Sequence, residues 1–236
     1  MRSRSIALLT GTLAVSVALV GCGPVITNQG ESVTEERSIS DVAEVRLQTS
    51  GNLTLAVGDE PSLTVTAGKN VLDHLTTDVS GDALVLDTDG SWGNHGAIDY
   101  TLTLPRLTDL TVAGSGDVRG QIASGETLSV TIKGSGDVRL DEVDAVEFRV
   151  SISGSGDVRL AGSAERLDVE VKGSGDYDGL ELDSQEAVVD VAGSGNVEVR
   201  VSDRLDATIA GSGSIRYEGD PRVNSTTRGS GSIEQR

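Results

Sequence analysis

The sequence predicts an all-β protein that folds as a single right-handed parallel β-helix (β-solenoid) with coils of about 18–20 residues. Three observations lead to this prediction. Gly-Ser-Gly recurs at this spacing through the second half of the chain, beginning at Gly114, Gly134, Gly154, Gly173, Gly193, Gly211 and Gly229. Apolar and polar residues alternate between the motifs. Aromatic residues make up only 2% of the chain, fewer than an ordinary globular core needs.

The chain begins with the features of an exported lipoprotein. Arg2 and Arg4 precede an apolar stretch, residues 6–20, which is short for a membrane span and typical of a signal peptide. The stretch ends in Leu-Val-Gly-Cys, which is similar to a bacterial lipobox, and Cys22 is the only cysteine. We therefore expect residues 1–21 to be a lipoprotein signal peptide and Cys22 to carry the lipid that anchors the protein to a membrane.

The segment after the signal peptide divides into a tether and one folded domain. Residues 22–39 hold the lipidated cysteine and a polar stretch without periodicity, which predicts a flexible tether. Residues 40–236 are expected to form the β-helix, with irregular coils over 40–108 and regular coils over 109–236. The irregular segment is also a candidate cap for one end of the stack.

The irregular segment contains partial copies of the repeat. Ser50-Gly51-Asn52 and Ser80-Gly81-Asp82 both resemble the Ser-Gly-Asp part of the later motif. Each is followed by alternating apolar residues, which predicts a degenerate coil at each place.

The regular coils show a strict period of two. In one repeat the residues of one parity are Phe148, Val150, Ile152, Gly154, Gly156, Val158 and Leu160. Those of the other parity are Ser151, Ser153, Ser155, Asp157 and Arg159. Such a pattern predicts β-strands with one face in the core and one in water. Because the glycines share the apolar parity, we expect them on the core side of a bend, where a Cβ would crowd the interior or forbid the backbone angles.

Three segments together resemble a known family. They are the sequence VAEVRL at 42–47, the sequence LTLPRL at 102–107, and GSGDV at 114–118. The chain is similar over about residues 40–236 to the bacterial envelope proteins called putative auto-transporter adhesin, head GIN domain. The resemblance implies a β-helix-like fold and an exported or surface location, and it brings no catalytic residues.

The charge of the chain limits its partners. The formal net charge is −18, and the signal peptide holds two of the basic residues. Phosphates of nucleic acids and anionic lipid headgroups would repel such a protein, so neither is an expected ligand, and membrane association is expected through Cys22. With two histidines and no free cysteine, the chain lacks ligands for a transition metal, and we expect no cofactor.

A column of acidic residues follows the Gly-Ser-Gly motifs. Its first members are Asp117, Asp137 and Asp157, and Asp176 continues it. The column is a candidate ligand-binding surface. The alternative is a structural role, in which the carboxylates pair with the arginines two residues further on or accept backbone N–H groups at the bend. Calcium is a weaker possibility, with Asp176 and Asp178 as the candidate ligands because a second acid replaces arginine there.

The loop over 87–99 is the second candidate site. It holds Trp92, the only tryptophan, and His95. An exposed tryptophan beside polar groups is typical of sugar-binding surfaces. The alternative is a loop whose tryptophan folds back over the end of a coil.

We therefore expect a non-catalytic lipoprotein of the cell envelope, facing outside the cytoplasm. It would be an adhesin-like or scaffolding rod that presents a polar acidic surface to envelope glycans or proteins. Two alternatives stay open: a glycan-cleaving β-helix enzyme with its site at Asp176, Asp178 or Trp92, and a passive envelope spacer or stress-related module. The short spacing between motifs leaves little room for the long loops that such enzymes place around their substrate.

Overall fold

A computed structural model describes residues 30–236 except 91, 92, 94, 123 and 124. The signal peptide, Cys22 and Trp92 lie outside the described residues. The strands are β1 (Ser32–Arg37), β2 (Glu44–Leu47), β3 (Asn52–Val57), β4 (Ser62–Gly68), β5 (Leu75–Ser80), β6 (Ala83–Thr88), β7 (Asp99–Leu104), β8 (Asp109–Val112), β9 (Val118–Gln121), β10 (Gly125–Ile132), β11 (Val138–Ile152), β12 (Val158–Val171), β13 (Tyr177–Val191), β14 (Asn196–Gly211), β15 (Ser214–Glu218), β16 (Arg222–Gly229) and β17 (Ser232–Gln235). One short helix, α1 (Lys69–Leu72), accompanies them.

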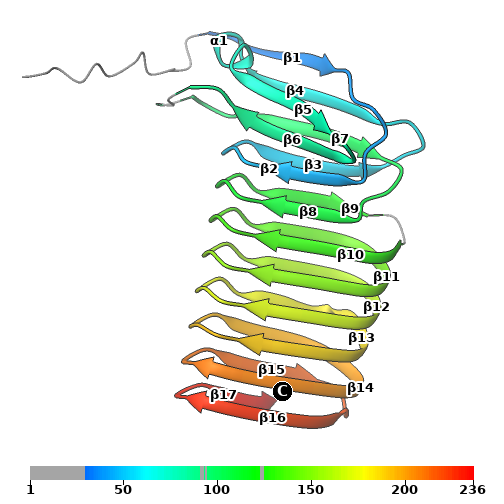
Figure 1. Ribbon diagram of the computed structural model, residues 1–236, viewed down its shortest axis with the longest axis vertical. Coiled ribbons are helices and arrows are strands. Elements are labelled where there is room, and N and C mark those ends of the chain that lie inside the picture. The colour runs from blue at the N-terminus through cyan, green and yellow to red at the C-terminus, as the bar shows by residue number, and fades with distance from the viewer. Residues whose placement is uncertain (1–29, 91–92, 94, 123–124) are drawn as a thin grey trace, which may run out of the picture.

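The strands stack as two parallel ladders that face each other across the core (Figure 1). One ladder runs β6–β2–β8–β10, then through the second halves of β11 to β14, and ends at β16. The other runs β7–β3–β9, then through the first halves of β11 to β14, and ends at β15 and β17. The all-β solenoid predicted from the repeats is therefore confirmed.

The core consists of columns of identical or similar side chains. Val130, Val150, Val169 and Val189 occupy one register position on successive coils, and all four are buried. Branched aliphatic side chains of equal length fill such a column without gaps, because each coil repeats the shape of the one before it. This regularity explains why the chain needs so few aromatic residues.

The coils do not stack in the order of the sequence. The first coil, β2 and β3, lies between the coil of β6 and β7 and the coil of β8 and β9. After β1, the chain thus enters the stack one coil inside its end, passes outward to that end through β4 to β7, and returns past its own first coil. The partial repeat at Ser50-Gly51-Asn52 forms a true coil bend, since the N–H of Gly116 binds the carbonyl of Thr49 directly before it.

The end of the stack beyond β6 and β7 is capped by antiparallel strands. β5 pairs with β6, β4 pairs with β7, and β1 pairs with β4. Irregular coils were therefore the wrong prediction for β4 and β5. The bend at Ser80-Gly81-Asp82 is a turn between antiparallel strands, in which Gly81 has φ +65°.

The predicted tether also needs a correction, because its boundary of 22–39 includes β1. β1 is a polar strand whose residues are exposed or partly exposed, so it shows no hydrophobic periodicity. Pairing with the edge of β4 holds it in place, and the sequence alone does not reveal such pairing. The folded domain therefore begins near residue 32.

The two sides on which the coils turn differ. On the glycine side, which lies at the left of Figure 1, each coil from β8 and β9 onward bends at Gly-Ser-Gly. From Ser135 onward the serine N–H binds the first glycine's carbonyl in the previous coil, as in Ser155 to Gly134 at 3.1 Å. A Cβ on Gly154 would overlap that same carbonyl oxygen. The first glycine of each motif is therefore required because backbones stack closely between coils. The second glycine also faces the core, since a Cβ on Gly195 would lie 2.9 Å from Cγ1 of Val171.

On the opposite side, which carries the groove described below and which we call the groove side, the chain reverses direction through β-bulges. The ladder register shifts between Leu140 and Val143 and between Arg159 and Ala161. Glu142 has φ +59° and Gly162 has φ +136°, both typical of tight reversals. These turns repeat in position but not in sequence.

Candidate functional site

The acidic column on the glycine side is a hydrogen-bonded ladder. Oδ1 of Asp117 accepts the N–H of Asp137 at 3.0 Å, and Oδ1 of Asp137 accepts the N–H of Asp157 at 2.8 Å. The ladder continues from Asp157 to the N–H of Asp176 at 2.8 Å and from Asp176 to the N–H of Asn196 at 2.6 Å. The structure therefore brings the predicted residues together, and it gives each carboxylate the structural role that was the alternative.

An arginine column runs beside the acidic column. Arg139 forms an ion pair with Asp141 at 3.5 Å, and Nε of Arg159 donates to Asp178 at 2.8 Å. Arg119 begins the column, and together the two columns line a groove of about 680 Å³ along this face. The surface is thus a stripe of alternating charge in which the second carboxylate oxygens remain available to water.

The candidate calcium ligands are engaged with protein groups. Oδ1 of Asp176 accepts both the backbone N–H and the side-chain amide of Asn196, and Asp178 binds Arg159. Within the described part of the chain, no three His, Cys, Asp or Glu side chains gather in a way that could hold a metal ion. The guanidinium group of Arg159 occupies the position from which a cation would neutralise Asp178.

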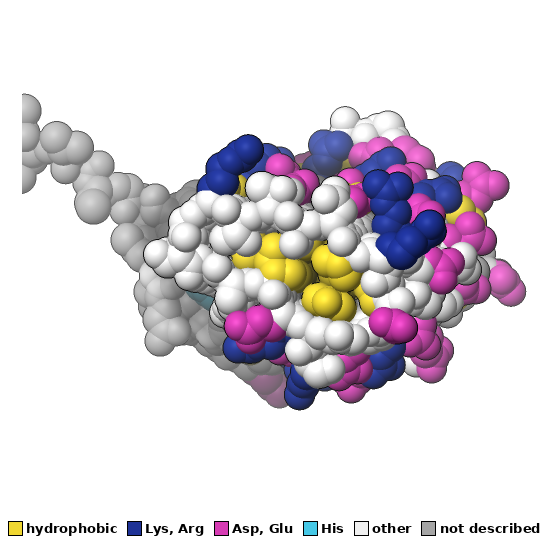
Figure 2. Space-filling view, turned by 90° about the horizontal axis from the view of Figure 1, so that it is seen from below, with side chains coloured by type: hydrophobic (Ala, Val, Ile, Leu, Met, Phe, Trp, Pro, Cys, Tyr) yellow, Lys and Arg dark blue, Asp and Glu magenta, His cyan; other side chains and the backbone are white. Residues whose placement is uncertain are grey.

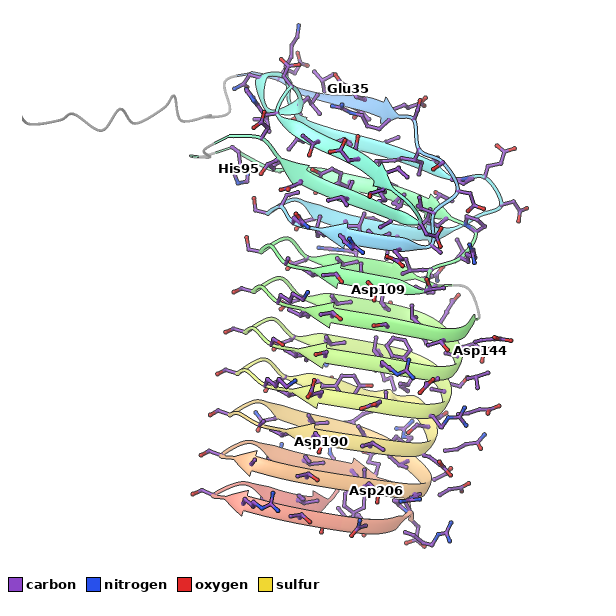
Figure 3. The ribbon with its side chains drawn as sticks, in the orientation of Figure 1. Glu35, His95, Asp109, Asp144, Asp190 and Asp206 are labelled. Atoms are coloured by element: carbon purple, nitrogen blue, oxygen red, sulfur yellow. The ribbon has the colours of Figure 1, made fainter. Side chains whose placement is uncertain are left out.

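The loop that carries His95 is attached to the glycine side (Figure 3). Nε2 of His95 lies 2.9 Å from the hydroxyl of Ser50, and Nδ1 lies 2.7 Å from the carbonyl oxygen of Gly96. Further along, the side-chain amide of Asn52 donates to Asp99 at 3.4 Å, while its oxygen accepts the N–H of Asp117 at 3.3 Å. The loop therefore lies at the head of the acidic column.

The groove side carries a larger concave surface that the sequence did not predict. A groove of about 1040 Å³ runs along the stack across successive coils. Its floor is formed by Ala145, Ala164, Ser184 and Val201, which are all buried and follow one another in register. The small residues Ala145, Ala164 and Ser184 keep the corner of each coil shallow, and their recurrence at intervals of 19 and 20 residues was the signal available in the sequence.

The rim of this groove is acidic. The lining side chains include Glu126, Asp144, Glu165, Asp183 and Asp220, and Arg200 is the basic residue among them. Arg200 is itself paired with Asp183 at 3.4 Å and with Glu218 at 3.1 Å. Asp144, labelled in Figure 3, accepts a hydrogen bond from the hydroxyl of Ser163 at 3.2 Å. The groove therefore combines a narrow uncharged floor with a negative rim.

Among the residues that the structure describes, no helix is long and apolar enough to cross a membrane.

Comparison with solved structures places the fold among bacterial proteins. The chain is similar to a putative adhesin from Bacteroides fragilis, with a TM-score of 0.84, 23% identity, and coverage of 89% of this chain and 100% of that one. It is similar to a putative lipid binding protein from Parabacteroides distasonis, with a TM-score of 0.76, 26% identity, and coverage of 90% and 100%. A putative adhesin from Parabacteroides merdae gives a TM-score of 0.70, 19% identity, and coverage of 89% and 98%.

None of the curated proteins compared with the chain matches it. A family model does match, over residues 41–221, which is most of the chain and nearly all of the solenoid. The chain belongs to the family described as putative auto-transporter adhesin, head GIN domain.

Proposed function

We propose that this protein is a non-catalytic lipoprotein of the cell envelope that binds a linear polymer along its side, as an adhesin or scaffold does. The observation that carries the proposal is the groove of about 1040 Å³ that crosses successive coils on the groove side. Membership of an adhesin family supports a role in recognition outside the cytoplasm. The lipid on Cys22 would hold the protein at the membrane surface.

The shape of the groove favours an extended ligand. It runs parallel to the stack, so each coil offers polar side chains at equivalent positions about 4.8 Å beyond the last, although the residues at these positions vary. A glycan chain, whose sugar rings advance by nearly this distance, can meet equivalent partners on successive coils. Serine hydroxyls such as those of Ser163 and Ser202 provide hydrogen bonds, and Val146, which is 37% exposed, provides an apolar contact.

The charge of the rim narrows the ligand class. Carboxylates of Glu126, Asp144 and Glu165 would repel a polyanionic glycan and would accept hydrogen bonds from hydroxyl or amino groups. The proposed ligand is therefore a neutral or amino-bearing glycan of the envelope. An envelope protein that presents an extended basic segment is the alternative ligand.

The test is binding of the full chain, in detergent micelles, to arrays of bacterial and host glycans and to isolated cell wall, with and without calcium. The variant Asp144→Lys/Glu165→Lys changes the rim of the groove and is expected to reduce binding at least tenfold. The matched variant Asp137→Asn/Asp157→Asn removes charge from the acidic column but keeps the oxygens that accept backbone N–H groups, and it should bind normally.

The outcome identifies which surface binds. Loss of binding in the Asn variant alone would move the site to the acidic column, and loss in Trp92→Ala would move it to the loop. Failure of the wild-type chain to bind any glycan or cell wall would overturn the glycan proposal and leave a protein ligand or a passive spacer.

A further inference from the structure

The two rims of the groove carry acidic residues in alternation. On each coil from β11 to β14, one exposed residue precedes the floor position and another follows it, and the two line opposite sides of the floor. We call these positions the first rim and the second rim. The first rim reads Asp144, Ser163 and Asp183 on successive coils. The second rim begins one coil earlier, where Gly125 takes the floor position, and reads Glu126, Val146, Glu165 and Gln185.

The carboxylates therefore change sides at every coil. Glu126 lies on the second rim, Asp144 on the first, Glu165 on the second and Asp183 on the first. One step is about 4.8 Å, the separation of stacked strands, so carboxylates on the same rim recur about every 10 Å. An uncharged side chain lies across from each, as Val146 lies across from Asp144. Figure 2, which looks along the stack, shows acidic side chains projecting at the right of the view, the side on which the groove lies.

The alternation ends at Arg200. This residue follows Asp183 on the first rim, and its guanidinium group pairs with Asp183 at 3.4 Å and with Glu218 at 3.1 Å. The side chain of Asp183 remains 74% exposed, so it is still open to a ligand. The stretch of groove that favours cations therefore covers four coils and stops at a basic residue.

The spacing of the carboxylates selects among extended polymers. A ligand that meets all four must advance by one coil per unit and present its cations on alternate edges. An extended peptide advances about 3.3 Å per residue, so its side chains fall out of step with coils about 4.8 Å apart. A β-1,4-linked sugar chain advances by nearly one coil per sugar, and each ring is turned over relative to the one before it. An amino group on C2 therefore appears on the two edges of that chain in turn.

We propose that the groove binds a β-1,4-linked chain of 2-amino sugars whose amino groups are free. Four consecutive ammonium groups donate to Glu126, Asp144, Glu165 and Asp183, in charge-assisted hydrogen bonds. The hydroxymethyl group of each sugar lies on the opposite edge, over an uncharged residue such as Val146 or Gln185. Arg200 repels a fifth ammonium group and so limits the cationic stretch. This inference rests on the proposed function and adds the linkage and the amino groups of the ligand.

The test compares three hexasaccharides by calorimetric titration into the full chain in detergent micelles. They are the hexamer of β-1,4-linked glucosamine, its fully N-acetylated form, and the hexamer of β-1,6-linked glucosamine. The titration is done at mildly acidic pH, at which the amino groups are protonated and most carboxylates stay ionised. The first hexamer is expected to bind at least tenfold more tightly than the other two. The acetylated form lacks the charges, and the flexible β-1,6 linkage does not hold the amino groups at this spacing.

An exchange of two exposed side chains tests the alternation itself. Glu165→Gln/Gln185→Glu keeps the net charge and nearly the shape of the rim, but it moves one carboxylate to the coil that already holds Asp183. Affinity for the β-1,4-linked glucosamine hexamer should fall about fivefold, with the denaturation midpoint unchanged. Glu36→Gln removes a charge from an exposed position on β1, far along the chain from the groove, and is the control that should bind as the wild type does.

Each other outcome overturns the inference in a distinct way. Equal affinity for the two glucosamine hexamers, or unchanged binding in the exchange variant, would show that charge alone attracts the ligand. Loss of binding in Asp137→Asn/Asp157→Asn would place the cations on the acidic column instead. A chain that binds another glycan or the cell wall but not the β-1,4-linked glucosamine hexamer would overturn this inference alone, whereas a chain that binds no glycan would overturn the proposed function as well.

Discussion

The chain reverses direction twice in each coil, once on the glycine side and once on the groove side, and the two reversals are built differently. On the glycine side, backbones of successive coils approach so closely that only hydrogen fits at Gly134, Gly154 and Gly173. On the groove side, bulges and left-handed residues such as Glu142 absorb the turn, and the register shifts from coil to coil. Backbones approach closely there only at single glycines that form no repeated motif, such as Gly162, whose Cβ would overlap the carbonyl oxygen of Val143. Close backbone stacking at every coil forces the sequence to repeat, whereas a looser turn leaves it free to vary and to carry the proposed binding surface.

The sharpest way to test this contrast is the same substitution on both sides. Gly154→Ala is expected to destabilise the protein by more than about 4 kcal/mol or to prevent folding, because its Cβ would overlap the carbonyl oxygen of Gly134. Gly125→Ala, on the groove side, should change the free energy of unfolding by less than about 0.5 kcal/mol, since no atom lies within 4 Å of its Cβ. Chemical denaturation measures both, and equal effects would contradict the contrast.

The second test concerns a coil in which a large buried ring replaces a small side chain. Tyr177 is buried where neighbouring coils have Val158 and Val197, and a Cβ on Gly179 would lie 2.5 Å from its hydroxyl oxygen. The ring therefore fills the space that the missing side chain leaves. Tyr177→Val should cost about 3 kcal/mol by leaving a cavity, and Gly179→Val about 2 kcal/mol by overpacking.

The double variant Tyr177→Val/Gly179→Val is then expected to be more stable than either single variant. It would give this coil the pair of valines that the next coil has at Val197 and Val199. A double-mutant cycle should show a coupling energy of about 2 kcal/mol or more. Additive losses would mean that the ring and the glycine do not compensate each other.

The same contrast explains what the sequence could predict. A motif that steric contact forces to repeat is visible by alignment, so the solenoid, its period and the alternation around Val150 and Ile152 were predictable. A cap within residues 40–108 was one of the predictions, but its structure was not predictable, because β1, β4 and β5 are held by antiparallel pairing between segments whose order in space differs from their order in the chain. Register between distant strands leaves little trace in a single sequence.

The two candidate binding surfaces differ in the same way. The acidic column was predictable because it follows the repeated motif, and its structural role was one of the two predicted alternatives. The groove escaped notice because Ala145, Ala164 and Ser184 differ in chemistry and share only their small size. A groove forms where side chains are small, whereas the alternation in a sequence reveals mainly the positions whose apolar side chains fill the core.

Alkaline pH should weaken the folded state through a tyrosine on the glycine side. Tyr100 packs against Gly51 at the first coil bend, and burial raises the pKa of its hydroxyl to about 12. Because the folded pKa is above the unfolded value of about 10, the stabilisation is complete below pH 10 and is lost as the pH rises through 12. The loss attributable to this group should approach 2–3 kcal/mol.

The measurement is the midpoint of denaturation between pH 9 and pH 12 in the wild-type chain and in Tyr100→Phe. The variant lacks the ionisable hydroxyl and should retain more of its stability at high pH. Burial also raises the pKa of Tyr177, so the double variant with Tyr177→Phe should be flatter still. A wild-type curve that is already flat would contradict the buried position of both hydroxyls.

The smallest expected effect tests whether the hydrogen bonds of the acidic column contribute to the stability of the fold. Asp157→Ala removes the acceptor for the N–H of Asp176 and should cost about 1 kcal/mol, whereas Asp157→Asn keeps an acceptor oxygen and should be nearly neutral. Thermal or chemical denaturation separates the two variants. If alanine and asparagine cost the same, the hydrogen bond contributes nothing to stability, and the column is retained for its charge. The acidic column would then be a second candidate binding surface in addition to the groove. The division between a structural glycine side and a binding groove side would fail.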